Sequence, residues 1–192
     1  MSTTTLYRLS ALAGFLSGLT IIIGKLLIPL PDPRPGETFD FLSPLFALLL
    51  TVGLYLRQRR ESGVFGGLAF FVLFIGLSLI VSLAYFGAFM FHELPEQVVD
   101  RMMDGPSGPV FIGSILIFVI GELLFGISVI RAGMFSRIAA VLFMITMVPT
   151  VLHLAGIFPE SVVVISSILA GVALIWWSVE LYGLASRQAD AV

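Results

Sequence analysis

The chain has 192 residues, of which 58% are hydrophobic and only 11% are charged, and its mean hydropathy is +1.09. Soluble globular domains are roughly 45–50% apolar and about 25% charged, so this composition excludes a water-soluble fold. A formal net charge of -2 leaves no basic surplus, which argues against nucleic acid as a partner. The absence of cysteine excludes disulfides and thiolate metal sites.

Six segments are long and apolar enough to cross a lipid bilayer, because a hydrocarbon core about 30 Å thick needs roughly 20 helical residues. They are residues 9–30, 41–56, 64–91, 109–130, 138–158 and 162–181. A backbone exposed to lipid must satisfy its own hydrogen bonds, and no alternating β pattern is present. We therefore expect an all-α integral membrane protein, a single domain built as a bundle of six transmembrane helices.

The arginines predict the orientation of these helices. Six crossings place both termini and the second and fourth loops on one side of the membrane. The arginines expected on that side are Arg8, Arg57, Arg59, Arg60, Arg131, Arg137 and Arg187. The opposite side has only Arg34 and Arg101, together with most of the acidic residues. Because cytoplasmic loops are enriched in Lys and Arg, we expect a protein of the cytoplasmic membrane with both termini in the cytoplasm.

Two segments on the outer side are long. Residues 31–40 are rich in proline, which predicts an extended acidic loop. Residues 93–108 predict a short amphipathic helix that begins near Pro95 and ends at Gly105. This helix is expected either on the outer membrane surface or as a plug over the bundle.

The two halves of the chain resemble each other weakly. Ile23–Leu27 reads IGKLL and Ile120–Leu124 reads IGELL, and the same offset without gaps aligns Tyr85 with Tyr182. Three helices followed by a copy of themselves are inverted in the membrane, an arrangement that many secondary transporters share. The alternative is chance similarity between helices rich in Leu, Ile and Gly.

Glu122 is the most informative residue, because it lies in the middle of the fourth predicted span. An ionised carboxylate at that depth is costly unless it is protonated, paired or hydrated, and such acids commonly mark ion or proton pathways. The alternative is a neutral, structural Glu that forms a hydrogen bond with a neighbour such as Thr51, Ser78, Ser82 or Thr146. Lys25 lies near the outer end of the first span and either reaches the surface or pairs with Asp40 or Glu122. Lys25 and Asp40 are therefore further candidates for binding an ion or substrate.

The two histidines, His92 and His153, both map to the outer half of their helices. Two imidazoles at similar height can ligate a haem iron or a metal ion, although the spacing matches no motif. The alternative is an ordinary solvated histidine at an interface, with no cofactor. Small residues recur every four positions in two spans, a pattern typical of close helix packing. They are Ser10, Gly14 and Gly18 in the first span, and Ser167 and Gly171 in the sixth.

No phosphate-binding loop, HExxH sequence or nucleophile elbow is present, so nothing in the sequence predicts an enzyme. The leading hypothesis is a small transporter, or an ion- or proton-coupled protein, that uses the buried Glu122. The alternatives are a non-catalytic accessory subunit that binds a partner membrane protein or a second copy of the chain, and a two-histidine haem or metal redox protein.

Overall fold

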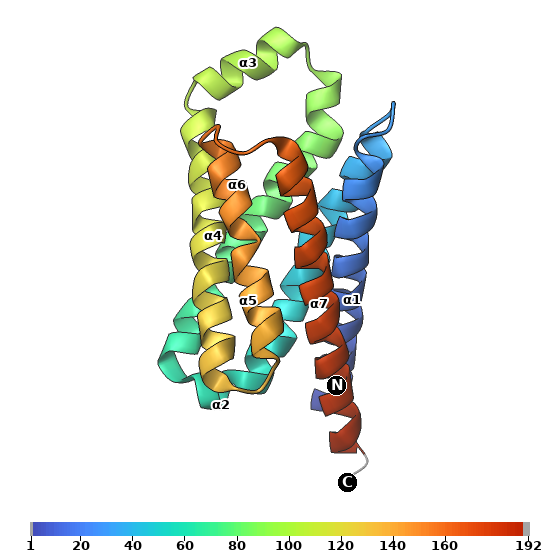
Figure 1. Cartoon of the computed structure of the whole chain (residues 1–192), viewed down its shortest axis with the longest axis vertical. Helices are drawn as coiled ribbons and strands as arrows, with labels where there is room; N and C mark the ends of the chain where they lie inside the picture. Colours follow the sequence, from blue (N-terminus) through green and yellow to red (C-terminus); the bar gives the residue numbers. More distant parts are fainter. Residues whose placement is uncertain (1, 190–192) are drawn as a thin grey trace.

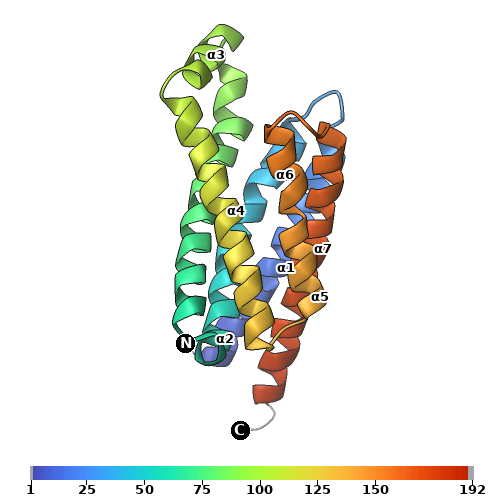
Figure 2. The ribbon, with the colours of Figure 1, turned by 60° about the vertical axis from the view of Figure 1, so that its left-hand side comes forward.

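The computed structural model describes residues 2–189, and within that range it consists of helices joined by short connecting segments, with no strand (Figure 1). The helices are α1 (Thr3–Leu27), α2 (Arg34–Tyr85), α3 (Glu96–Asp104), α4 (Ser107–Ala132), α5 (Arg137–Ile145), α6 (Met147–Leu154) and α7 (Glu160–Ala189). A short π-helical segment, η1 (Phe86–Met90), and a 3-10 segment, η2 (Phe91–Glu93), follow α2. The two chain ends lie at one end of the bundle, the terminal end, and α3 lies at the other, the α3 end (Figures 1 and 2).

Five helical segments of the described chain have the length and composition needed to cross a membrane. They are Thr3–Leu27, Arg34–Glu93, Ser107–Ala132, Arg137–Leu154 and Glu160–Arg187. Large apolar side chains are exposed along these segments; Val64 is 83% exposed, and Leu68 and Ile165 are also exposed. These properties support the predicted class of helical membrane protein.

The second of these segments turns back on itself at Gly63. The backbone angles there are φ 57° and ψ -152°, a conformation that only glycine adopts readily. Residues 34–62 form a first arm that descends toward the terminal end, and residues 64–85 form a second arm that returns toward the α3 end (Figure 1). The rings of Tyr55 and Phe70, one from each arm, stack with their centroids 4.5 Å apart. The arms therefore pack as a helical hairpin.

The prediction of an extended loop over residues 31–40 is wrong beyond Pro33, because α2 already begins at Arg34. Pro33 is the N-cap residue, and Pro35 lies in the first turn. Backbone N–H groups in the first turn have no acceptor within the helix, so a proline there costs no helical hydrogen bond. The negative charge of Glu37 in the same turn stabilises the helix, because it lies at the positive end of the helix dipole. The predicted helix within residues 93–108 is present as α3, which follows Pro95 and ends before Gly105.

The helix expected over residues 138–158 is interrupted. The helix α5 ends at Ile145, Thr146 forms a turn, and α6 begins at Met147. Pro149 explains the position of the interruption, because proline has no N–H to donate and its ring clashes with the carbonyl four residues earlier, that of Ile145. The Thr146 hydroxyl donates a hydrogen bond of 2.6 Å to the Phe143 carbonyl at this turn.

The small residues of α1 lie where it packs against its neighbours. Ser10 contacts Gly53 of α2, and Gly14 lies against side chains of α2 and α7. Gly18 and Gly171 face each other, and a methyl group on Gly18 would come within 2.5 Å of the Gly171 carbonyl oxygen. These glycines therefore allow α1 and α7 to approach closely along their length.

Candidate functional site

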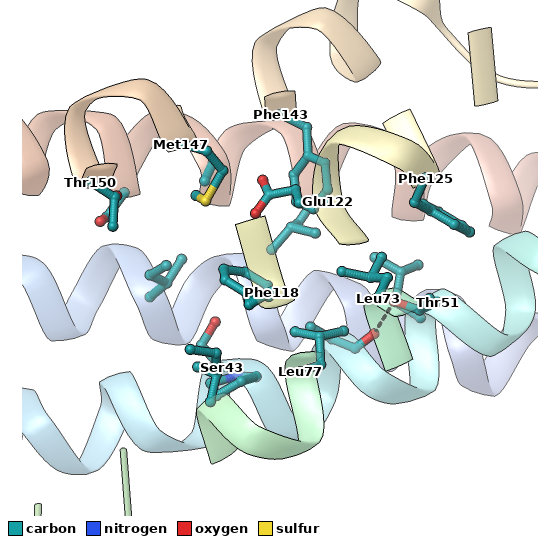
Figure 3. Close-up of a pocket in the computed structure, with 18 of the residues that line it drawn as sticks. Ser43, Thr51, Leu73, Leu77, Phe118, Glu122, Phe125, Phe143, Met147 and Thr150 are labelled. Atoms are coloured by element: carbon teal, nitrogen blue, oxygen red, sulfur yellow. Dashed lines mark hydrogen bonds between the residues drawn. The ribbon is translucent and has the colours of Figure 1, made fainter. Parts of the chain in front are cut away.

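A cavity of about 270 Å³ lies between α1, α2, α4, α5, α6 and α7 (Figure 3). Its walls are mainly apolar. Among the residues that line it, three carry ionisable groups at neutral pH, and they are the three predicted candidates Lys25, Asp40 and Glu122. Ser167, predicted as a packing residue, also lines this cavity. The fold thus brings together residues that are far apart in the sequence.

Glu122 lies in the interior of α4 and is 0% exposed. Its side chain lies beside Phe118, Phe143 and Met147 (Figure 3). Within residues 2–189, neither carboxylate oxygen has a hydrogen-bond partner. A buried polar group without a partner is uncommon in native proteins, and each instance requires a physical explanation. The hydroxyls that the sequence suggested as partners do not supply one, because each donates to a main-chain carbonyl; they belong to Thr51, Ser78, Ser82 and Thr146.

Gly121 determines how closely Glu122 approaches the second arm of α2. A methyl group on Gly121 would come within 2.5 Å of the Leu73 Cα atom and 2.7 Å of its nitrogen. Gly76 makes the reciprocal contact, because a methyl group there would lie 2.5 Å from the Phe118 Cα atom. The two glycines therefore hold α4 directly against α2 and keep the neighbouring carboxylate within the bundle.

Lys25 and Asp40 form an ion pair at the edge of the cavity. The Lys25 Nζ atom donates a hydrogen bond of 2.8 Å to Oδ2 of Asp40, and the two side chains are 17% and 31% exposed. Gly24 and Gly36 make this possible, because α1 and α2 cross so closely that a methyl group on Gly24 would lie 2.9 Å from the Gly36 carbonyl oxygen. The sequence analysis named Asp40 and Glu122 as possible partners of Lys25, and in the structure Lys25 pairs with Asp40.

Toward the terminal end, a layer of buried apolar side chains lines the cavity. Leu54, Leu73 and Phe125 line it there, and each is only 1% exposed. One helical turn further on, Gln58 and Ser128 are both 0% exposed and do not line the cavity. Both atoms of the Gln58 amide, and the Ser128 hydroxyl, lack a hydrogen-bond partner within the described residues. Buried polar groups therefore lie on both sides of the apolar layer.

Sequence reasoning missed Trp177 as a cavity residue. The side chain is 1% exposed, and its ring centroid lies 4.9 Å from that of Phe143. Its indole nitrogen has no acceptor within residues 2–189. The adjacent Trp176 is instead 39% exposed and donates a hydrogen bond to Glu180. The only available signal was the WW pair itself, because one of two adjacent tryptophans on a helix must face a different direction from the other.

The two histidines do not line the cavity, and each has its own partner. His92 Nε2 pairs with the Glu37 carboxylate, and His153 Nδ1 donates to the Phe158 carbonyl oxygen at 2.9 Å. Within the described part of the chain, no group of three or more His, Cys, Asp or Glu side chains could hold a metal ion. These contacts do not favour the haem or metal hypothesis.

The fold and the cavity together define a helical membrane protein with a carboxylate buried beside an internal cavity. Comparisons of the chain with protein-family models, with curated proteins and with solved structures give no match.

Proposed function

We propose that the chain is a small membrane transporter in which the Glu122 carboxyl group releases a bound proton when the ligand of the cavity binds, and takes a proton up again when the ligand leaves. The observation that carries this proposal is that Glu122 is completely buried, faces the cavity and has no hydrogen-bond partner within residues 2–189. An acid retained for structure would be hydrogen-bonded, because an unpaired buried polar group costs about 1–3 kcal/mol or more. A carboxyl group with a functional role explains that cost.

We infer that access to Glu122 is one-sided. The cavity extends from Glu122 to the partly exposed Lys25–Asp40 pair near the α3 end, whereas its lining residues toward the terminal end, such as Leu54 and Phe125, are buried. A site near the middle of the membrane that opens to one side at a time is the arrangement required for alternating access.

Two of the helices around the cavity are weakened by proline. The break at Thr146 lies between Phe143 and Met147, which both line the cavity. Pro44 also lines it and cannot donate a hydrogen bond to the Asp40 carbonyl. Interrupted helices at membrane depth are tolerated where they line a cavity, and they commonly form transporter sites.

We propose six crossings in all, with the two arms of α2 as separate spans joined at Gly63. The arginine-rich loops and both chain ends then lie together at the terminal end, in the cytoplasm, and α3 lies on the outer surface of the cytoplasmic membrane. The amphipathic composition of α3, in which no residue is buried, supports this placement.

Two features of this arrangement support an inverted repeat of three helices. The first and last spans pack closely at Gly18 and Gly171, and the third and fourth pack closely at Gly76 and Gly121; a pseudo-twofold axis in the membrane plane would relate these two pairs of spans. The second span of each half also contains an internal proline, Pro44 or Pro149, about three helical turns after the span begins at Arg34 or Arg137.

Infrared spectroscopy of the protein in lipid tests the role of Glu122. We expect a carboxyl C=O band that shifts in heavy water, disappears as the pH is raised and is absent from Glu122→Gln. Glu180→Gln is the matched control, because Glu180 accepts a hydrogen bond from the Ser136 N–H outside the cavity. A band that does not respond to pH between 4 and 10, or that persists in Glu122→Gln, would contradict the proposal.

A further inference from the structure

The charges in the cavity do not balance. Lys25 and Asp40 neutralise each other across 2.8 Å, which leaves Glu122 as the one ionisable group among the described lining residues without a counter-charge. When Glu122 is ionised, the cavity therefore carries one net negative charge. A ligand that compensates it must carry a single positive charge, because a second one would again be unpaired in a largely apolar space.

The walls near Glu122 are aromatic. Phe118, Phe125, Phe143 and Trp177 all line the cavity, and the rings of Phe143 and Trp177 lie 4.9 Å apart at an interplanar angle of 58°. The faces of aromatic rings attract organic cations, and the attraction increases when water is excluded. The ring edges and aliphatic side chains of the same walls accommodate an apolar ligand body.

The donor set does not suit an inorganic cation. Hard metal ions take about six or more oxygen ligands, whereas Glu122 supplies only two. The other side-chain oxygens of the lining belong to neutral hydroxyls, except for the Asp40 carboxylate, which is already paired with Lys25. No metal-binding group of three His, Cys, Asp or Glu side chains occurs among residues 2–189.

We propose that this cavity binds a small lipophilic organic cation, with its ammonium group against the Glu122 carboxylate and its apolar body against the aromatic walls. The volume of about 270 Å³ is near the lower end of the usual range for ligand pockets, which favours a ligand of small size. This inference rests on the proposed function and names its substrate class. One cation replaces one proton on Glu122, so that the total charge of the site is the same with either one bound.

Benzyltrimethylammonium is a suitable probe, because its charge is permanent and its neutral isostere, neopentylbenzene, has the same shape. Trp176→Phe leaves Trp177 as the single tryptophan, since the chain has 2, and places the reporter in the cavity wall. In this background we expect saturable quenching of Trp177 fluorescence by benzyltrimethylammonium. Its affinity should rise by up to tenfold for each unit of pH, because binding displaces one proton.

Glu122→Gln in the same background should bind benzyltrimethylammonium at least tenfold more weakly, while its affinity for neopentylbenzene stays within about twofold. That second measurement shows that the cavity of the variant is intact. Glu180→Gln, which removes a carboxylate outside the cavity, should bind both probes as the parent does.

The inference is overturned if benzyltrimethylammonium binds the parent no more tightly than neopentylbenzene does, or if Glu122→Gln binds both probes unchanged. The infrared experiment separates the substrate class from the proposed function. A pH-sensitive Glu122 band without ammonium binding rejects the substrate class alone, and the absence of that band rejects the proposed function as well.

Discussion

Lys25 of α1 and Asp40 of α2 form an ion pair of 2.8 Å at the edge of the same cavity in which Glu122 has no partner. The pair determines how the cavity is charged, because it removes the only lysine and the only aspartate of the lining from the charge balance. Glu122 is left to interact with whatever enters. The contrast between a paired and an unpaired carboxylate in one cavity is the basis of the functional account.

The Lys25–Asp40 pair should contribute little net stability, but removing only one partner should be costly because it leaves the other charge unpaired. We expect Lys25→Met and Asp40→Asn each to lower the thermal stability of the detergent-purified protein. The double variant should recover part of the loss, with a coupling of about 1 kcal/mol, since both side chains are partly exposed. Additive effects of the two substitutions would show that the ion pair contributes nothing.

Gly121→Ala should destabilise the contact between α2 and α4. The added methyl group meets the Leu73 backbone at 2.5 Å, and a backbone cannot move aside as a flexible side chain can. We expect a loss of about 1–3 kcal/mol, measured as a lower midpoint of thermal unfolding. Gly113→Ala in the same helix is the control, because nothing lies within 4 Å of its added methyl group, and its stability should be unchanged or higher. Equal effects at the two positions would contradict the helix contact.

Gly63→Ala should impair the turn between the two arms of α2. The conformation at φ 57° and ψ -152° strains any residue with a Cβ atom, by about 1–3 kcal/mol, although nothing lies within 4 Å of the added methyl group. The midpoint of thermal unfolding should therefore fall. Gly183→Ala also meets open space but lies in a regular helix, and it should not lower the midpoint. If Gly63→Ala were as stable as Gly183→Ala, the hairpin would be wrong.

The absence of cysteine allows the topology to be tested with single-cysteine variants. Thr3→Cys and Glu61→Cys should be protected from a membrane-impermeant thiol reagent in intact cells and should react after the membrane is opened. Asp32→Cys, Glu96→Cys and Glu160→Cys should react in intact cells. All five positions are exposed in the structure. Reaction of Glu61→Cys together with Asp32→Cys in intact cells would show that the arms of α2 are not two crossings.

The spans could be predicted from the sequence because each needs only a sufficient length of apolar residues. Local interruptions could not be predicted in this way, since hydropathy averages over them. The break at Thr146 lies inside a continuous apolar stretch, and the early start of α2 at Arg34 depends on prolines that are tolerated in a first turn.

The main candidate residues were predicted from the free-energy cost of a charged side chain in the lipid core, which can be judged for each residue by itself. Glu122 and Lys25 were found by this criterion, and Asp40 was found as a possible partner of Lys25; all three line one cavity. Trp177 and Gln58 were not found, because the inward face of a helix that is apolar all round cannot be read from its periodicity. The choice of Asp40 as the partner of Lys25 required the close helix crossing that the structure supplies.

The thermal stability of Glu122→Leu and Glu122→Gln, measured beside the wild type in detergent, tests the central claim most directly. If the carboxyl group serves function and has no structural partner, both variants should be as stable as the wild type or more stable, by up to roughly 1–3 kcal/mol for the leucine variant. A clear loss of stability in both variants would contradict the account. Glu122 would then be a structural residue, and the accessory-subunit hypothesis, with a partner protein to be sought by co-purification, would replace the transporter.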